Sequence, residues 1–332
     1  MAPTLALPQT GRGIMNARLV RRHGWTIGVY ALLLASLIFT VAIHPTYSAF
    51  DVKSLALGAL PLAFAAAAQT VVVLSGGIDL TVGPMMAVAN VLAARAMLHN
   101  NFRDALLIAA LVLILGCAAG AFNGSLVVFS RVPDIVVTLA MSFVWGGVAL
   151  LILEKPGGGA PLDFQNLAQE TTLSPWIPNA LILLIVVVAA VWVPLRGSRP
   201  GLALYAIGSD RTAAHASGVN VPLARVLAYT ISGAFCAAGG LALTMTTGIG
   251  SPLSGSFYTL SGVATIVLGG VSLAGGRGGM LGPMAAAFIL TLIPADLIFL
   301  GIDPNYGQVI QGIVIVLVVM VGGLAALRRK PA

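Results

Sequence analysis

The feature of this sequence that most limits its fold is an apolar stretch from Leu55 to Ala94, in which Asp79 is the only ionisable side chain. A helix needs about 20 apolar residues to cross the roughly 30 Å hydrocarbon layer of a bilayer. The stretch is therefore too long for one crossing, and we expect it to cross, turn and cross again. The segment SGGIDLTVG, Ser75–Gly83, is the only part polar enough for the turn.

The composition agrees with a membrane protein. Of the 332 residues, 58% are hydrophobic and 8% are charged, and the mean hydropathy is +1.01. A soluble globular chain carries about 25% charged residues, so this chain lacks the charge to cover a water-facing surface. Its two cysteines, Cys117 and Cys236, form neither a disulfide framework nor a metal-ligand spacing.

The hydropathy pattern predicts an all-α, polytopic membrane helix bundle with about ten transmembrane helices. The first is longer than a typical signal-peptide core and lacks a clean cleavage site after it, so we expect it to be retained. The domain prediction is an N-terminal tail (1–24), a transmembrane domain (25–327) and a C-terminal tail (328–332). The expected spans are 25–44, 54–74, 82–98, 105–129, 134–153, 177–195, 226–246, 258–273, 280–300 and 306–327.

The charges predict the orientation. Ten spans place both termini on one side, and 13 of the 17 Lys and Arg residues fall on that side. The other four, Lys53, Arg95, Arg103 and Lys155, fall opposite. Cytoplasmic loops are enriched in Lys and Arg, so both termini are expected in the cytoplasm. The formal charge of +7 is thus a topology signal, and no basic cluster with interleaved aromatic residues indicates nucleic acid.

Two segments of the sequence resemble each other. VVVLSGGIDLTVGPMMAVA begins at Val71, and TIVLGGVSLAGGRGGMLGPMAAA begins at Thr265. Each has paired glycines followed by Gly-Pro-Met, and the second carries a six-residue excess between them. Small-residue membrane helices resemble one another by composition alone. A genuine repeat would indicate two related halves that both turn on the cytoplasmic side, a common plan in transporters.

The opening segment has two readings. Gly76 and Gly77 can break a helix, and broken backbone at membrane depth must be buried in protein or line water. A carboxylate such as Asp79 is costly there, so one reading makes the segment part of a gate. The other reading makes it a tight cytoplasmic turn in which Asp79 caps the next helix. The residues alone favour neither.

Polar side chains inside the predicted spans are candidates for the lining of a path. Each of them can equally form a helix–helix hydrogen bond, worth about 0.6 kcal/mol. Asp296 is an additional acid inside a span, beside Pro294. The candidate lining residues are Gln69, Asn90, Asn123, Thr138, Ser142 and Trp145.

The hydrophilic segment 196–225 contains a short helix signal, RTAAHASG. Asp210 stands at an N-cap position and Gly218 at a C′ position. A helix this short is marginal alone in water, so a partner surface would stabilise it. The alternative is an amphipathic piece that rests on the membrane.

Three ordered motifs give the chain a family resemblance. GGIDLTVGPMMAVANVLAA resembles the signature of ABC permeases that import ribose, xylose and galactofuranose. GSDRTAAHASGVNVPLARVLAYTISG resembles the family's cytoplasmic loop, and IVLGGVSLAGGRGGMLGP resembles its glycine-rich segment near the C-terminus. The glycines of that last segment are Gly269, Gly270, Gly275, Gly276 and Gly278.

The resemblance implies a bacterial inner-membrane permease subunit that works with a cytoplasmic ABC ATPase, a periplasmic sugar-binding protein and a second permease subunit. The loop would dock on the ATPase, which would bind ATP and Mg. GGRGG has no following Lys-Ser/Thr and is no phosphate cradle, so we expect no cofactor, metal or catalytic site in this chain. The predicted coupling residues are Asp210, Ala213, Ala214, Ser217, Gly218 and Val219.

The chain departs from the family pattern in three places. Asp210-Arg211 stands where Asn-Pro is common, SFYTLSGVATIVLGG lacks the usual two acids, and Pro294-Ala295-Asp296 replaces common asparagines. The sugar therefore does not follow from the resemblance. The expected function is monosaccharide import by alternating access. The alternatives are a permease for a branched-chain amino acid or a quorum signal, an ion-coupled secondary transporter that uses Asp79 and Asp296, and a membrane scaffold.

Overall fold

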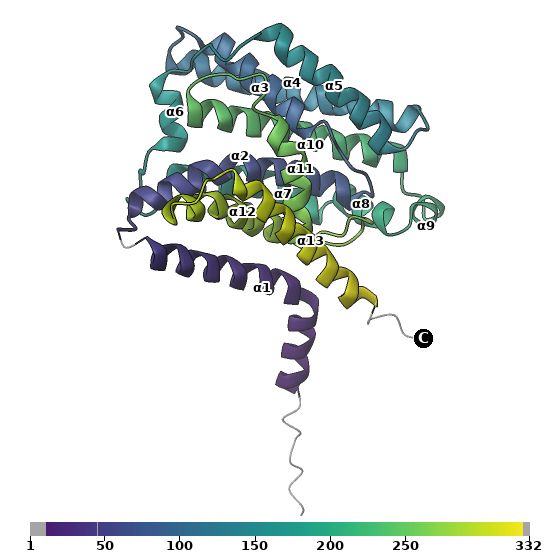
Figure 1. The fold of residues 1–332 in the computed structure, drawn as a ribbon. Coiled ribbons are helices and arrows are strands. Elements are labelled where there is room, and N and C mark those ends of the chain that lie inside the picture. Colours follow the sequence, from purple (N-terminus) through teal and green to yellow (C-terminus); the bar gives the residue numbers. More distant parts are fainter. Residues whose placement is uncertain (1–10, 45, 328–332) are drawn as a thin grey trace, which may run out of the picture.

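The computed structural model describes residues 11–44 and 46–327, and the side chains from residue 24 onward apart from Pro45 and several near the C-terminus. The tail 328–332 and the first ten residues of the tail 1–24 lie outside the described residues. The described chain is all-helical (Figure 1), which confirms the predicted fold class. Its helices are α1 (Gly11–Ile43), α2 (Ala49–Leu74), α3 (Val82–Met97), α4 (Phe102–Phe129), α5 (Asp134–Ile152), α6 (Leu162–Gln169), α7 (Asn179–Gly197), α8 (Arg199–Ser209), α9 (Arg211–Ala216), α10 (Val221–Thr247), α11 (Ser256–Leu268), α12 (Leu281–Phe299) and α13 (Tyr306–Leu327).

Each of the ten expected spans coincides with a helix, but their lengths differ. Seven helices of the described chain are long and apolar enough to cross a membrane: α1, α2, α4, α5, α7, α10 and α12. Helices α3 and α11 are apolar but have only 16 and 13 residues. At 1.5 Å per residue they are about 24 and 20 Å long, shorter than the hydrocarbon layer. The molecule is therefore a polytopic membrane protein that includes short helices.

Three sequence expectations need correction. The polar stretch between α5 and α7 was expected to be a loop, but it contains α6. The segment 196–225 was expected to be hydrophilic with one short helix, but most of it is helical because Ser198 caps α8 and Pro200 stands in its first turn. The span expected to end at Leu273 ends at Leu268, because Gly270 takes a left-handed conformation (φ +83°) that stops α11.

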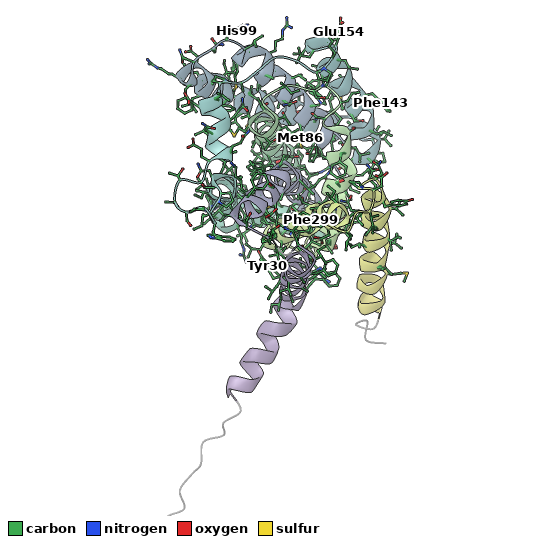
Figure 2. All side chains as sticks on the ribbon, turned by 60° about the vertical axis from the view of Figure 1, so that its left-hand side comes forward. Tyr30, Met86, His99, Phe143, Glu154 and Phe299 are labelled. Carbon is green, nitrogen blue, oxygen red and sulfur yellow. The ribbon has the colours of Figure 1, made fainter. Side chains whose placement is uncertain are left out.

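The core surrounds α2 and α10. Helix α2 packs against α7, α10, α11 and α12, and its alanines from Ala65 to Ala68 are fully buried. Small residues let membrane helices approach closely, since lipid gives little hydrophobic drive for association. Met86 of α3 also lies inside the bundle (Figure 2).

Helix α4 crosses α10 through glycines. Gly116, Gly120 and Gly124 lie four residues apart on one face of α4, and each faces α10. A Cβ on Gly120 would collide with the carbonyl oxygen of Tyr229 and lie 3.0 Å from the Cα of Gly233. This is the small-residue spacing of close membrane helix pairs.

The two similar segments end their first helices in the same way. After α2, Gly76 N–H donates to the Val73 carbonyl and Gly77 N–H to the Val72 carbonyl, at 2.9 and 3.2 Å. After α11, the N–H groups of Gly270 and Val271 donate to the carbonyls of Val267 and Ile266, at 3.0 and 2.9 Å. Both are Schellman motifs, so the similarity extends to helix termination and pairs Gly76 with Gly270.

The bundle has two distinct ends. We call the end that carries α8, α9 and the Ser75–Thr81 loop the α9 end, and the end that carries α6, His99 and Glu154 the α6 end. Figure 1 places α9 and α6 on opposite sides, and Figure 2 shows His99 and Glu154 apart from each other at its upper edge. Gly276 N–H donates to the Leu74 carbonyl at 3.1 Å, so both turns of the similar segments lie at the α9 end.

Candidate coupling and translocation site

The Ser75–Thr81 loop is the centre of the candidate site, because it holds a buried carboxylate. The Asp79 side chain is 1% exposed. Its Oδ1 accepts hydrogen bonds from the Thr81 N–H, at 2.9 Å, and from the Thr81 hydroxyl. Its Oδ2 accepts from the Ser232 hydroxyl of α10 at 3.0 Å. The bonds from Thr81 are those of a local turn before α3, whereas the bond from Ser232 ties the loop to another helix.

The hydrogen bonds continue from Asp79 into α4 and α5. Asn123 Nδ2 donates to the Thr81 hydroxyl at 3.0 Å, and the Trp145 indole N–H donates to Asn123 Oδ1 at 3.0 Å. The sulfur of Met85 lies 3.3 Å from both Thr81 Oγ1 and Asn123 Nδ2. Residues from the loop, α4, α5 and α10 therefore form one buried network.

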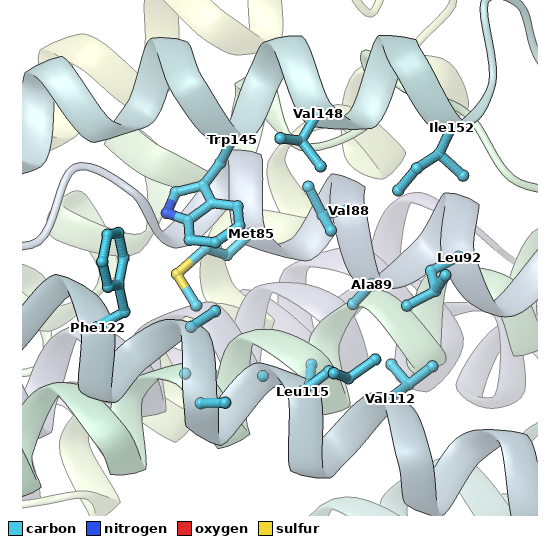
Figure 3. A pocket seen from close by; sticks show the side chains of 15 residues that line it. Met85, Val88, Ala89, Leu92, Val112, Leu115, Phe122, Trp145, Val148 and Ile152 are labelled. Atoms are coloured by element: carbon cyan, nitrogen blue, oxygen red, sulfur yellow. The ribbon is translucent and has the colours of Figure 1, made fainter.

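The network borders a cavity of about 410 Å³ between α3, α4, α5 and α10. Figure 3 shows Trp145 and Met85 at its wall, with Phe122 beside them. The rest of the lining is apolar, and Trp145 is the only one of the described lining residues with a polar side-chain group. Such a wall offers aromatic faces and one N–H that is already held by Asn123, so it presents few free hydrogen-bonding groups to a polar solute.

Two further predicted residues hold the loop. Gln69 of α2 is fully buried, and its amide N–H donates to the Asp79 carbonyl oxygen at 2.6 Å. The Thr138 hydroxyl of α5 lies 3.2 Å from the Ile78 carbonyl oxygen, to which it can donate. The loop is thus fixed by side chains on both of its flanks.

Two predicted path residues do not join this network. Asn90 Nδ2 donates to the Thr244 hydroxyl at 2.9 Å and its Oδ1 accepts from the Ser251 N–H at 2.8 Å, which ties α3 to the end of α10 and the loop after it. The Ser142 hydroxyl donates to the Leu139 carbonyl of its own helix at 2.6 Å. Both side chains serve hydrogen bonds that stabilise the fold.

A buried ion pair lies beside the loop. Arg225 of α10, which is 6% exposed, donates from Nη2 to Asp134 Oδ2 at the start of α5. The Tyr229 hydroxyl donates to the same oxygen at 3.2 Å. A Cβ on Gly77 would lie 2.6 Å from that oxygen. The pair therefore joins the ends of α5 and α10 directly against the glycines of the loop.

Three backbone segments meet at the α9 end, in what we call the glycine junction: Leu74–Gly76, Gly208 and Gly275–Gly276. A Cβ on Gly208 of α8 would collide with the Leu74 carbonyl oxygen and with the Gly276 nitrogen. A Cβ on Gly275 would lie 2.9 Å from the Cα atoms of both Gly208 and Gly76. The close approach needs glycine, because any side chain would separate the segments.

Helix α9 has the caps that the sequence predicts. Asp210 accepts hydrogen bonds from the N–H groups of Thr212 and Ala213 at 2.8 and 2.9 Å. Gly218 (φ +82°) and Val219 close a Schellman motif onto His215 and Ala214. Ala214 is buried and Val219 is half-buried, whereas Asp210, Ala213, Ser217 and Gly218 are exposed. The helix therefore presents an open face away from the bundle.

Tyr205 ties α8 to the glycine-rich segment. Its hydroxyl donates to the Gly278 carbonyl oxygen at 3.0 Å. Burial raises the pKa of Tyr205 above its usual value, and nearby Arg196 partly offsets this effect. This upward shift of the pKa favours the neutral phenol, which can donate a hydrogen bond.

The remaining predicted glycines make close contacts around α11. A Cβ on Gly269 would collide with the backbone nitrogen of Pro283 at the start of α12. Gly270 faces the ring of Trp25 in α1, whose indole N–H donates to the Leu268 carbonyl at 3.0 Å. These contacts pack α1, α11 and α12 together at the α9 end.

Asp296 lies far from this site. Its Oδ1 accepts from the Thr40 hydroxyl of α1 at 2.7 Å, near the end of α12 that is opposite the glycine-rich segment. A second hollow, of about 700 Å³, lies between α1, α2, α7 and α12. Its lining is almost wholly apolar and includes none of the predicted path residues.

Sequence reasoning missed several residues of the site. Asp134 and Arg225 each adjoin a long apolar run, and a lone charge at such a boundary does not indicate its partner. Thr81 and Ser232 are hydroxyl residues in small-residue surroundings, where the sequence carries no distinguishing signal. Gly208 lies within an otherwise unremarked YAIGSD segment, and only tertiary contacts identify it.

Comparison with known proteins places these features in a family context. Residues 52–319 match the family model described as branched-chain amino acid transport system / permease component. The chain is 31% identical over 267 residues to the ribose import permease protein of Escherichia coli (strain K12), covering 78% of this chain and 81% of the relative. It is 29% identical over 304 residues to the fructose import permease protein of Rhizobium meliloti, covering 89% and 84%.

A third relative has another named solute. The chain is 30% identical over 302 residues to the autoinducer 2 import system permease protein of Enterobacter sp. (strain 638), covering 90% of this chain and 86% of the relative. No solved structure matches the chain.

Proposed function

Because this chain belongs to the family described as branched-chain amino acid transport system / permease component, we propose that it forms the membrane path of an ATP-driven importer for a monosaccharide. The chain is a multi-pass membrane protein and a transport subunit without catalytic chemistry of its own, homologous to bacterial inner-membrane permeases. The observation that carries the proposal is the family match, which spans residues 52–319 and therefore includes the loop, the cavity wall and α9.

In the proposed topology α1, α2, α3, α4, α5, α7, α10, α11, α12 and α13 make ten passes, and the α9 end faces the cytoplasm. The charge distribution supports this orientation, since 13 of the 17 Lys and Arg residues then lie on the cytoplasmic side. The short helix α3 is compatible with it, because the Ser75–Thr81 loop before it is largely buried against neighbouring helices. The segment after α11 is partly buried, with Gly269, Val271 and Gly275 inside the bundle.

We assign one proposed partner to each end of the bundle, the α9 end and the α6 end. A cytoplasmic ABC ATPase docks on the exposed face of α9 within segment 196–225 and binds ATP and Mg, and a periplasmic sugar-binding protein delivers solute at the α6 end. A second permease subunit completes the path. The capped, outward-facing α9 supports the docking assignment, because a six-residue helix gains its stability from a partner surface.

In the proposed mechanism, ATP binding moves α9 and α8 and opens the cavity beside Trp145 alternately to each side. A neutral sugar needs no buried counter-charge, and its C–H faces can lie on the rings of Trp145 and Phe122. The apolar wall keeps binding weak, which favours release after each cycle. The glycines of the α11–α12 segment, among them Gly270, Gly275 and Gly276, adopt positive φ values that other residues rarely take, and this segment can change conformation at low cost.

The test reconstitutes the complex, purified through a tag on this chain, in proteoliposomes with its binding protein. We expect ATP-dependent uptake of a monosaccharide such as ribose or fructose, and the binding protein's thermal-shift response should select the same compound. Uptake of autoinducer 2 or of a branched-chain amino acid instead would replace the solute assignment. Uptake that survives loss of ATP but collapses with an uncoupler would overturn the proposal in favour of an ion-coupled transporter.

The positions of Asp79 and Asp296 give little support to the alternative of an ion-coupled secondary transporter. Asp79 lies at the α9 end, whereas Asp296 bonds Thr40 near the opposite end. Among the described residues, the ion pairs within 4.0 Å include neither of these acids. Two separated carboxylates do not form a continuous path for an ion.

A further inference from the structure

We propose that the Ser75–Thr81 loop transmits movement of the α8–α9 arm to the cavity, with the Thr81 hydroxyl as the link between Asp79 and the cavity wall at Trp145. This inference rests on the proposed function and adds the physical connection between the two places that an importer must couple. In this role Asp79 and Thr81 are positioning residues.

The first step of the connection is the glycine junction. Gly208 is two residues before Asp210, the N-cap of α9, and its backbone touches the Leu74 carbonyl without an intervening side chain. Gly276 N–H donates to the same carbonyl at 3.1 Å. A displacement of α8 therefore presses directly on the end of α2 and on the corresponding turn after α11.

The second step is the loop itself, which has little freedom between its ends. The Schellman motif fixes Gly76 and Gly77 to the last turn of α2. Gln69 holds the Asp79 carbonyl, and Thr138 contacts the Ile78 carbonyl. Asp79 then joins Thr81 on its own segment to Ser232 on α10. Because these hydrogen bonds hold the loop along its length, a movement at Leu74 shifts the loop as a unit.

The third step is the Thr81 hydroxyl. A hydroxyl has one donor and two acceptor positions, and this one donates to Asp79 while it accepts from Asn123 at 3.0 Å. Asn123 in turn accepts from the Trp145 indole N–H. Trp145 forms part of the cavity wall (Figure 3). The hydrogen bonds from the loop to Trp145 are thus continuous, and the Thr81 hydroxyl joins Asp79 to Asn123 within them.

The experiment uses Trp145 as the reporter. In the assembled complex, Trp25, Trp176 and Trp192 are replaced by Phe, so that emission comes from Trp145 alone within this chain, and the same complex without Trp145 supplies the background. We expect a non-hydrolysable ATP analogue to change the Trp145 emission in this parent. Thr81→Val removes the hydroxyl at nearly constant volume. We expect Thr81→Val to abolish the change in Trp145 emission. It should also lower solute uptake per ATP hydrolysed about tenfold, because the variant loses one to two buried hydrogen bonds.

Matched variants separate this role from general stability. Thr81→Ser retains the hydroxyl and should restore both readouts. Gly208→Ala should lose the nucleotide response, whereas Gly197→Ala, whose Cβ would meet nothing within 4 Å, should keep it. If Thr81→Val does not assemble, Asn123→Leu breaks the same link from the α4 side and is expected to give the same loss.

The outcomes distinguish the two proposals. A parent complex without ATP-dependent uptake would overturn the proposed function. The transmission role alone would be overturned if the parent transports solute and Thr81→Val matches Thr81→Ser in its Trp145 emission response and in uptake per ATP hydrolysed. It would also be overturned if Thr81→Val assembles fully but Gly208→Ala and Gly197→Ala give the same nucleotide response.

Discussion

At the scale of single residues, the Asp79 carboxylate makes hydrogen bonds beyond those of a local helix cap. Its bonds to Thr81 organise the turn before α3, as a capping residue would. Its bond to Ser232 reaches α10, which no local cap requires. A buried carboxylate that accepts several hydrogen bonds is stabilised without a cation, so the network keeps it inside the bundle.

The Asp134–Arg225 pair gives a prediction at this scale. Asp134→Asn leaves the Arg225 guanidinium buried without its counter-charge, and such a loss costs about 3–5 kcal/mol. We expect a clear fall in the thermal unfolding temperature of the detergent-purified protein. Combining Asp134→Asn with Arg225→Met should cost less than the sum of the single changes, because the uncompensated charge disappears. Additive effects would show that the two side chains do not stabilise each other.

At the scale of elements, helix ends and crossings determine how the site is placed. The Schellman motifs after α2, α9 and α11 stop three helices with the same backbone geometry. Two of these ends belong to the similar segments and meet at the glycine junction. The α4–α10 crossing then brings Asn123 within reach of the loop, because glycines allow the two backbones to approach.

A substitution at Gly120 tests the close crossing of α4 and α10. Gly120→Val inserts a side chain where a Cβ already collides with the Tyr229 carbonyl oxygen, and overpacking of this kind typically costs about 1–3 kcal/mol. We expect lower thermal stability than for Gly146→Val in α5, which has the same change in helix propensity but meets nothing within 4 Å. Equal stabilities for the two variants would contradict the close crossing.

The caps of α9 give a second prediction for an element. Asp210→Ala removes the acceptor for two N–H groups, a loss of about 1 kcal/mol, and Asp210→Asn retains an acceptor. We expect uptake per ATP hydrolysed to fall in the alanine variant and to stay near normal in the asparagine variant. Gly218→Val should lower it as well, since a β-branched residue is strained at φ +82°. Normal coupling in both Asp210→Ala and Gly218→Val would contradict docking through α9.

At the scale of the whole molecule, the two ends of the bundle differ in structure and in charge. The α9 end carries the glycine junction, the buried ion pair and the exposed α9. The α6 end carries the bridge between Gly157 and Gly250 and the bonds of Asn90 to the loop after α10. An asymmetry of this kind suits a subunit that meets a different partner on each side of a membrane.

Orientation is testable directly. In a background without Cys117 and Cys236, a cysteine at Thr212 on α9 should react with a membrane-impermeant thiol reagent only after the cytoplasmic side is opened. A cysteine at Lys155 should react in cells whose outer membrane alone is permeable. The reverse pattern would invert the topology and remove the proposed ATPase contact, whatever the solute.

The sequence by itself determined the membrane class, the position of the ten apolar helices and both caps of α9. These follow from local composition, hydropathy and the backbone preferences of Asp and Gly, which need no knowledge of distant contacts. It also indicated that Gln69, Asp79, Asn123 and Trp145 belong to the site, but it gave Asn90 and Ser142 the same weight.

Only the tertiary structure decided which polar residues act together and which segments touch. Thr81, Ser232 and Gly208 acquire their roles from neighbours 42 to 153 residues away along the chain. The pairing of Asp134 with Arg225 likewise depends on how α5 and α10 pack. Hydrogen bonds and close backbone contacts act over a few ångströms, so a pattern of residue types cannot specify them until the helices have been placed side by side.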